Sequence, residues 1–321
     1  KCSLRQCSPD SRKDMNLLLT GCFKYSDEQM GVLRSLGYNV YFMQQEKKEL
    51  PLEASKLDAA VCNGLFLSHD IDQFSRLKFI QLTSAGFDRV PVDKIKARGM
   101  ELFNARGVYS TPMAEWAMFR VLEHYKQGWF FRKEQEGRRW VKHRGLREVA
   151  GMKVAVVGAG NVGQEVAKRF KAFGAETTGF DIHTHETAGF DHMVLTETIH
   201  ERVGEFDVVV VTAPLLSSTL GLISREVLLA MKQDASLVNI DRGGLIDEQA
   251  MWEVLAERKD LFAALDGFET EPLAEDSPLW RLENVAVSPH NSFVSDGNNA
   301  RMFAVIYQNL KKMIINKLLM D

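Results

Sequence analysis

The sequence predicts an α/β protein built on doubly wound parallel sheets, and three observations carry that prediction. Short apolar runs alternate with amphipathic helical stretches along most of the chain, which is typical of parallel sheets covered by helices. A length of 321 residues suits two domains better than a single core. Residues 153–181 join a buried strand, a glycine-rich turn, a helix and a second strand. We expect the rest of the chain to be organised around this segment.

Composition excludes several classes of function. Hydrophobic residues make up 45% of the chain and charged residues 26%, as in ordinary globular proteins. A net charge of −3 offers no positive field to nucleic acid or to an anionic membrane, and no apolar run approaches the ~18 residues of a membrane span. The four cysteines have neither the spacing of a zinc site nor the framework of a secreted protein. We therefore expect a cytoplasmic protein with free thiols and no metal site.

The first domain is predicted to begin at Met15. Residues 1–14 are polar and lack an apolar stretch, so we expect them to be a disordered leader. The loop Ser84-Ala85-Gly86 follows a strand, and its small side chains leave backbone N–H groups accessible to a small anion. Taken alone, this loop fits an ordinary turn better. The predicted strands of this domain span residues 17–20, 39–42, 59–62, 79–82 and 101–103.

Two helical segments follow this domain. Thr111 as N-cap, with Pro112 at the first helical position, predicts a helix that ends near His124 and links the domains. Residues 129–144 are rich in Arg and Lys with interleaved aromatic residues, a mixture that would suit a nucleic acid. Because two glutamates dilute that charge, a protruding helical arm from Arg132 to Arg144, used in oligomer contacts, is the better interpretation.

The segment 153–181 has the parts that hold a dinucleotide. Gly158, Gly160 and Gly163 have the spacing G-x-G-x-x-G, which permits a tight turn, a close approach of the backbone to a pyrophosphate, and close helix–strand packing. The following helix offers N-terminal N–H groups to the phosphates. Asp181 ends the second strand, where it can accept hydrogen bonds from ribose hydroxyls and would repel a 2′-phosphate. The segment therefore predicts NAD rather than NADP, and a glycine-rich turn in some other α/β protein is the alternative.

Three strand ends in the second half of the chain carry groups suited to chemistry beside a nicotinamide. Arg242, Glu271 and His290 follow successive strands, and ligands of an open α/β sheet bind at the carboxyl ends of its strands. Arg binds a carboxylate bidentately, and a His paired with a carboxylate donates a proton near neutral pH. Each residue alone fits an ordinary surface role, but together they favour a 2-keto acid substrate. The predicted strands are 208–212, 236–240, 263–265 and 285–287, and the predicted helices are 225–231, 248–258 and 300–319, the last packing on the first domain.

With these motifs the chain resembles the D-isomer-specific 2-hydroxyacid dehydrogenases. The resemblance rests on the fingerprint with Asp181 and on residues 212–215, 239–247, 265–272 and 288–290, in that order. It implies an NAD-dependent oxidoreductase that interconverts a small D-2-hydroxy acid and its 2-keto acid. Hydroxypyruvate, glyoxylate and 3-phosphoglycerate stay open as substrates.

The resemblance also implies a domain plan. Two Rossmann-like domains are expected, with an NAD-binding domain of residues 111–291 inserted in a flavodoxin-like substrate domain of residues 15–110 and 292–321. Family members are usually homodimers joined through the NAD-binding domain, which fits an arm over Trp129–Arg144.

Individual roles follow from the same resemblance. Arg242 would bind the carboxylate and the keto oxygen of the substrate, and His290 would be the acid/base, held protonated by Glu271. The loop of Ser84, Ala85 and Gly86 would contact the substrate carboxylate. The implied cofactor contacts are Gly158, Gly160, Asn161, Val162, Gly163, Asp181, Thr212, Ala213, Pro214, Thr219, Ile240 and Asp266.

Two departures and two rival functions stay open. Asp241 stands before Arg242 where the family tends to have a small residue, so a carboxylate there could compete for Arg242 or repel an anionic substrate. Gly267 replaces a usual Val. An NAD(H)-sensing interaction protein of corepressor type, on the same fold, would retain the same three residues. A formate dehydrogenase is disfavoured, because that branch carries Gln where this chain has Glu271.

Overall fold

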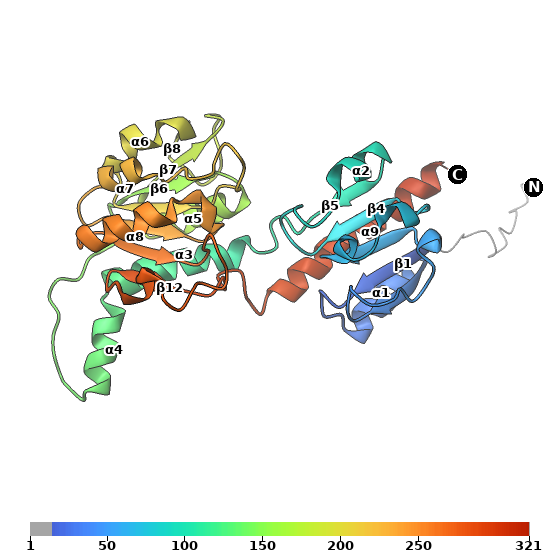
Figure 1. Ribbon diagram of the computed structural model, residues 1–321, viewed down its shortest axis with the longest axis horizontal. Helices are drawn as coiled ribbons and strands as arrows, with labels where there is room; N and C mark the ends of the chain where they lie inside the picture. The colour runs from blue at the N-terminus through green and yellow to red at the C-terminus, as the bar shows by residue number, and fades with distance from the viewer. Residues whose placement is uncertain (1–14, 321) are drawn as a thin grey trace, which may run out of the picture. The chain divides into compact units, whose positions relative to one another are not determined.

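The computed structural model describes residues 15–320, so the predicted leader lies outside the described residues. The chain divides into two compact units (Figure 1). The first unit comprises the chain up to Val108 together with the segment from Asp296, and the second unit is Tyr109–Ser295. The boundaries expected from the sequence lie after residues 110 and 291.

The first unit is a five-stranded parallel sheet in the order β2-β1-β3-β4-β5. This is the flavodoxin-like order of a doubly wound sheet. Its strands are β1 (Met15–Thr20), β2 (Tyr38–Met43), β3 (Ala59–Cys62), β4 (Phe79–Leu82) and β5 (Glu101–Phe103). Its helices are α1 (Asp27–Ser35), α2 (Val92–Ala97) and α9 (Asn298–Met320), with short 3₁₀ turns at Ala54–Lys56, Leu65–Leu67 and Ile71–Gln73.

The last helix packs on this first sheet, as the sequence predicts. Tyr38 donates a hydrogen bond from its hydroxyl to the carbonyl of Leu310 at 2.9 Å, and Asn309 donates to the side chain of Gln81 at 2.8 Å. Ile306 and Leu310 are fully buried. Burial of this apolar stripe therefore fixes α9 on the unit that also contains the start of the described chain.

The second unit is a seven-stranded parallel sheet in the order β12-β11-β10-β9-β6-β7-β8. This is the Rossmann order with one further strand. All strands are parallel, and the order of successive strands reverses between β6 and β9. Its strands are β6 (Lys153–Val157), β7 (Glu176–Asp181), β8 (His192–Leu195), β9 (Val208–Val211), β10 (Ser236–Asn239), β11 (Phe262–Leu265) and β12 (Val285–Val287). Its helices are α3 (Ser110–Tyr125), α4 (Gly128–Glu136), α5 (Asn161–Ala172), α6 (Ile199–Arg202), α7 (Arg225–Ala230) and α8 (Glu248–Glu257), with 3₁₀ turns at Thr196–Thr198, Val203–Glu205, Gly243–Leu245 and Pro278–Arg281.

Two hydrophobic layers enclose this second sheet. Val154 and Val156 of β6 pack with α3 and α5 on one face, whereas Ala155 and Val157 pack with α6, α7 and α8 on the other. Successive side chains of a strand point to opposite faces, so a run that is apolar at every position is what a strand covered on both sides requires. The predicted α/β class with two doubly wound parallel sheets is confirmed.

Two local features differ from what the sequence predicts. Thr111 is not the N-cap of α3: the helix begins at Ser110 after Tyr109, and no side chain caps it. The start is fixed instead by packing, since Ser110 and Pro112 are buried. The short edge strand β8 is absent from the strands predicted from the sequence, although three of its four residues, Met193, Val194 and Leu195, are apolar.

The predicted arm is helical only in its first part. Helix α4 ends at Glu136, and residues 137–148 form no helix or strand; Figure 1 shows α4 extending away from the sheet of its unit. Arg139 turns back to pair with Glu134 at 2.7 Å, which folds the chain against the end of α4. Among residues 15–320, no helix combines the length and the apolar character needed to cross a bilayer.

Candidate active site

The glycine-rich turn between β6 and α5 is built on backbone proximity. Gly158 has φ +103°, and a Cβ there would lie 2.6 Å from the backbone nitrogen of Ala213. A Cβ at Gly163 would lie 2.0 Å from the carbonyl oxygen of Gly158. A Cβ at Gly160, by contrast, would meet no protein atom within 4 Å. Two glycines are thus required by the fold, and the middle one leaves room for a ligand.

The N-terminus of α5 is open to an anion. Its N-cap is Gly160, no side chain caps the helix, and its first turn has no acidic residue. The first helical hydrogen bond runs from the N–H of Gln164 to the carbonyl of Gly160 at 2.9 Å, so the N–H groups of Val162 and Gly163 precede the helical ladder. Such a terminus suits a phosphate.

Asp181 ends β7 beside this turn. One carboxylate oxygen accepts from the N–H of Ala159 at 2.8 Å and the other from the N–H of Ile182 at 2.7 Å. The side chain is half-buried. The carboxylate is therefore fixed next to the glycine-rich turn, and its remaining lone pairs can accept hydrogen bonds from a ribose.

The predicted cofactor contacts after β9 also have structural roles, in the glycine-rich turn and in the loop that follows β9. The hydroxyl of Thr212 donates to the carbonyl of Gly158 at 2.8 Å and is buried behind the turn. Thr219 donates to the carbonyl of Pro214 at 2.6 Å and accepts from the N–H of Leu216 at 2.8 Å, closing the loop after β9. Ala213 and Ile240 are buried in the unit's core.

Arg242, Glu271 and His290 come together after β10, β11 and β12. Nδ1 of His290 lies 2.8 Å from Oε2 of Glu271, and its Nε2 lies 3.4 Å from Nη1 of Arg242. Arg can only donate, so Nε2 accepts in this arrangement while Nδ1 carries a proton toward Glu271. No carboxylate of the described residues forms an ion pair with Arg242. Its guanidinium therefore remains available to a substrate carboxylate.

Asp266 holds the loop that carries His290. Its carboxylate is 1% exposed and accepts from the hydroxyl of Ser288 at 2.6 Å and from the N–H groups of Asn291 and Ser292 at 2.9 and 2.8 Å. His290 itself has φ +49° and donates its N–H to the carbonyl of Asp266 at 2.9 Å. A residue in the left-handed region persists only where its surroundings over-determine it, and Asp266 supplies that constraint.

Ser288 and the supporting role of Asp266 escaped sequence reasoning. The resemblance implies a contact of Asp266 with the cofactor, which stays a prediction; the structure adds that its carboxylate accepts from three donors of the His290 loop. A signal was available, because an acidic residue in an otherwise apolar strand end must be buried against donors. The partners themselves lie more than twenty residues away and leave no local pattern.

The loop Ser84-Ala85-Gly86 belongs to the first unit. The hydroxyl of Ser84 donates to the carbonyl of Gly86 at 3.0 Å, and Asn104 donates to the carbonyl of Ala85. Within residues 15–320, none of the three backbone N–H groups has an acceptor. They are available donors for a small anion, as the sequence predicts. The described residues hold no group of three or more His, Cys, Asp or Glu placed to bind a metal ion.

A glycine-rich turn before an open helix start, in the same unit as a paired His and Glu, suits a nicotinamide-dependent oxidoreductase. The sequence profile of the D-isomer specific 2-hydroxyacid dehydrogenase NAD binding domain matches residues 118–292. The chain belongs to this family, and its second unit is the NAD-binding domain.

Named relatives agree with this assignment. The D-3-phosphoglycerate dehydrogenase of Methanocaldococcus jannaschii is 33% identical over 285 residues, which is 85% of this chain and 52% of that protein. The hydroxypyruvate reductase of Thermotoga maritima is 34% identical over 259 residues, which is 76% of this chain and 81% of that protein. The chain thus spans about half the length of the first of these relatives.

A solved structure agrees as well. The D-isomer specific 2-hydroxyacid dehydrogenase family protein from Aeromonas salmonicida is 26% identical and matches with a TM-score of 0.78, over 94% of this chain and 96% of that one.

Proposed function

We propose that the chain is an NAD-dependent oxidoreductase that interconverts a small D-2-hydroxy acid and its 2-keto acid. The observation that carries the proposal is His290, held between Glu271 at 2.8 Å and Arg242 at 3.4 Å. NAD, held by the turn at Gly158–Gly163 and by Asp181, supplies the hydride chemistry when bound. The N–H groups of the Ser84–Gly86 loop support a contact with the substrate carboxylate, and that contact stays a prediction.

The three strand-end residues divide the remaining work. Arg242 binds and orients the carboxylate and the keto oxygen, since its guanidinium offers a fork of donors. His290 gives the proton on Nε2 to the keto oxygen during reduction and takes it back during oxidation. Glu271 holds the ring through Nδ1 and stabilises the protonated imidazole, as a carboxylate does in other acid/base pairs.

Preference for NAD over NADP rests on Asp181. Its carboxylate stands where the adenosine ribose is expected, and Ile182 follows it with 73% of its surface exposed. A 2′-phosphate there would meet a negative charge without an Arg partner. We expect NADH to be preferred over NADPH in the same assay.

The sensor of corepressor type is the second candidate, and it is not favoured. The relatives are named as dehydrogenases and reductases. A sensor needs only the cofactor turn, whereas the available guanidinium of Arg242 and the pairing of His290 with Glu271 are arrangements for a reacting keto acid.

The test is oxidation of NADH with a panel of 2-keto acids, repeated with Glu271→Gln and His290→Ala. Each variant should lose about 10²- to 10⁴-fold in turnover, the usual contribution of general acid–base catalysis. Glu269→Gln is the matched control, because Glu269 lies two residues away and its carboxylate accepts from the N–H of Glu248 instead of pairing with His290. Tight NADH binding with no turnover on any acid would favour the sensor.

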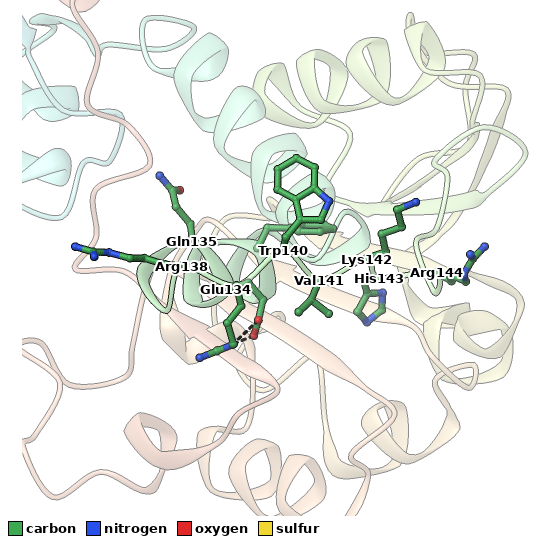
Figure 2. Close-up of a pocket in the computed structure, with 10 residues that line it drawn as sticks. Glu134, Gln135, Arg138, Trp140, Val141, Lys142, His143 and Arg144 are labelled. Carbon is green, nitrogen blue, oxygen red and sulfur yellow. Dashed lines mark hydrogen bonds and ion pairs between the residues drawn. The ribbon is translucent and has the colours of Figure 1, made fainter.

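We also propose that the chain is a homodimer joined through the NAD-binding domain and the arm of Trp129–Arg144. Trp140 is 97% exposed, and it is one of the residues 131, 134–135 and 138–144 that line a hollow on this arm (Figure 2). A large exposed aromatic next to such a hollow suits a protein partner.

Analytical ultracentrifugation should give twice the 36.3 kDa of one chain, and Trp140→Asp should shift the protein toward monomer. Leu67→Asp, on the first unit, is the control; a wild-type monomer at micromolar concentration contradicts the proposal.

A further inference from the structure

Asp241 is an ionisable group at the candidate active site that the proposed mechanism does not use. It follows β10 and directly precedes Arg242. Its Oδ1 accepts from the backbone N–H of Arg242 at 2.9 Å, and its own N–H donates to Asn239 at 3.1 Å. The residue is half-buried. The side chain is thus fixed at the strand end and not swung away into solvent.

The backbone at this position is fixed from a second direction. A Cβ at Gly267 would lie 2.2 Å from the carbonyl oxygen of Asp241, so any side chain at position 267 would displace residue 241. Asp241 and Gly267, two of the departures from the family pattern, therefore lie against each other. Asn239 completes the arrangement by donating to the carbonyl of Arg242 at 3.2 Å.

The other two carboxylates of the site are already engaged. Glu271 pairs with Nδ1 of His290, and Asp266 accepts hydrogen bonds from three donors of the His290 loop. Asp241 differs from both, since its Oδ2 has no hydrogen-bond donor among residues 15–320. Nor does Asp241 neutralise Arg242, because no ion pair joins the two side chains.

We propose that Asp241 selects substrates by charge, favouring 2-keto acids with a single negative charge over those with a second anionic group near Arg242 and His290. The proposal rests on the function proposed above. A fixed carboxylate at the edge of a partly desolvated site repels a second negative charge, and the effect is largest where water is displaced. Burial raises the pKa of Asp241, and the N–H and the positive charge of Arg242 oppose that increase.

Oxamate and oxalate form a matched pair of probes, since they have nearly the same shape and differ by one negative charge. Their dissociation constants are measured by calorimetry on the NADH complex at pH 7.5, for the wild type and Asp241→Asn. The Asn keeps an acceptor for the N–H of Arg242 and removes the charge. We expect the affinity ratio of oxalate to oxamate to rise about tenfold in the variant.

Asp247→Asn is the control, because Asp247 also accepts from a backbone N–H, that of Ala250, at the N-terminus of α8. It should leave the ratio unchanged, and an equal rise in this control would overturn the proposal. An unchanged ratio in Asp241→Asn, with both anions bound, overturns the role of Asp241 alone. A wild-type protein that binds neither anion and turns over no 2-keto acid overturns the proposed function, and with it this one.

Discussion

Helices α1 and α5 occupy the same place in two similar sheets, yet only one of them offers a phosphate site. Each helix follows the first strand of its doubly wound sheet, β1 or β6. At α1, Ser26 accepts from the N–H of Gln29 at 3.1 Å, and Gln29 accepts from the N–H of Ser26 at 2.9 Å. Asp27 and Glu28 then add negative charge to the first turn.

The difference shows that topology alone does not make a nucleotide site. A capping box satisfies the N–H groups that a phosphate would need, and acidic residues in the first turn use the positive end of the helix dipole. At α5 the cap is Gly160, with no side-chain bond and no acid. Local chemistry at the helix start therefore decides which of the two sheets binds the cofactor.

The largest expected effect comes from adding a methyl group to the turn before α5. Gly163→Ala puts a Cβ 2.0 Å from the carbonyl of Gly158, so the turn must open and NADH binding should be lost. Gly160→Ala meets no protein atom, so the fold should be retained while the methyl group occupies pyrophosphate space. NADH affinity, measured by fluorescence titration, should fall about tenfold or more in Gly160→Ala, or ~1.4 kcal/mol. Unchanged affinity would contradict the site at this turn.

Ser26→Ala is the matched control at the other helix. It removes the cap of α1, which should lower the free energy of unfolding by ~1 kcal/mol. NADH affinity should not change, because α1 lies in the first unit and its start is already closed by its own capping box. A weaker affinity for NADH in this variant would contradict the conclusion that only α5 of these two helices offers a phosphate site.

Much of this contrast can be predicted from sequence, because glycine requirements are local. The spacing of Gly158, Gly160 and Gly163 and the apolar strand before them indicate the turn, and the structure shows why two of the three cannot carry a Cβ. Arg242 and His290 follow from the rule that ligands gather at strand ends. These features depend on residues a few positions apart.

The rest depends on contacts distant in sequence. Asp266 reaches residues of the His290 loop more than twenty positions on, and the approach of Asp241 to Gly267 joins two different strand ends. The start of α3 follows from tertiary burial and not from its apparent cap. Tertiary packing overrides a local signal in such places, so sequence reasoning identified the residues but not these partners.

Acid should lower the free energy of unfolding of the second unit more than that of the first. The group responsible is His124 on α3, and the expected effect is smaller than that of the glycine variants. Its ring stacks on Phe262 with centroids 4.0 Å apart. Burial, assisted by the positive charge of Arg147, lowers the pKa of His124 from 6.5 to about 4. The unfolded chain therefore binds a proton between pH 6.5 and 4 that the folded chain does not. Stability from this group is complete above pH 6.5 and decreases as the pH falls toward 4.

The loss should be ~2 kcal/mol, allowing for the partial exposure of the ring. Chemical unfolding followed at pH 7 and pH 4.5 measures it, with His124→Phe as the variant that keeps a ring against Phe262 and cannot titrate. The variant should lose less stability on acidification than the wild type, and the difference should appear in the transition of the second unit. Equal losses in both proteins would contradict the prediction, because protonation of His124 would then contribute nothing to the loss of stability in acid.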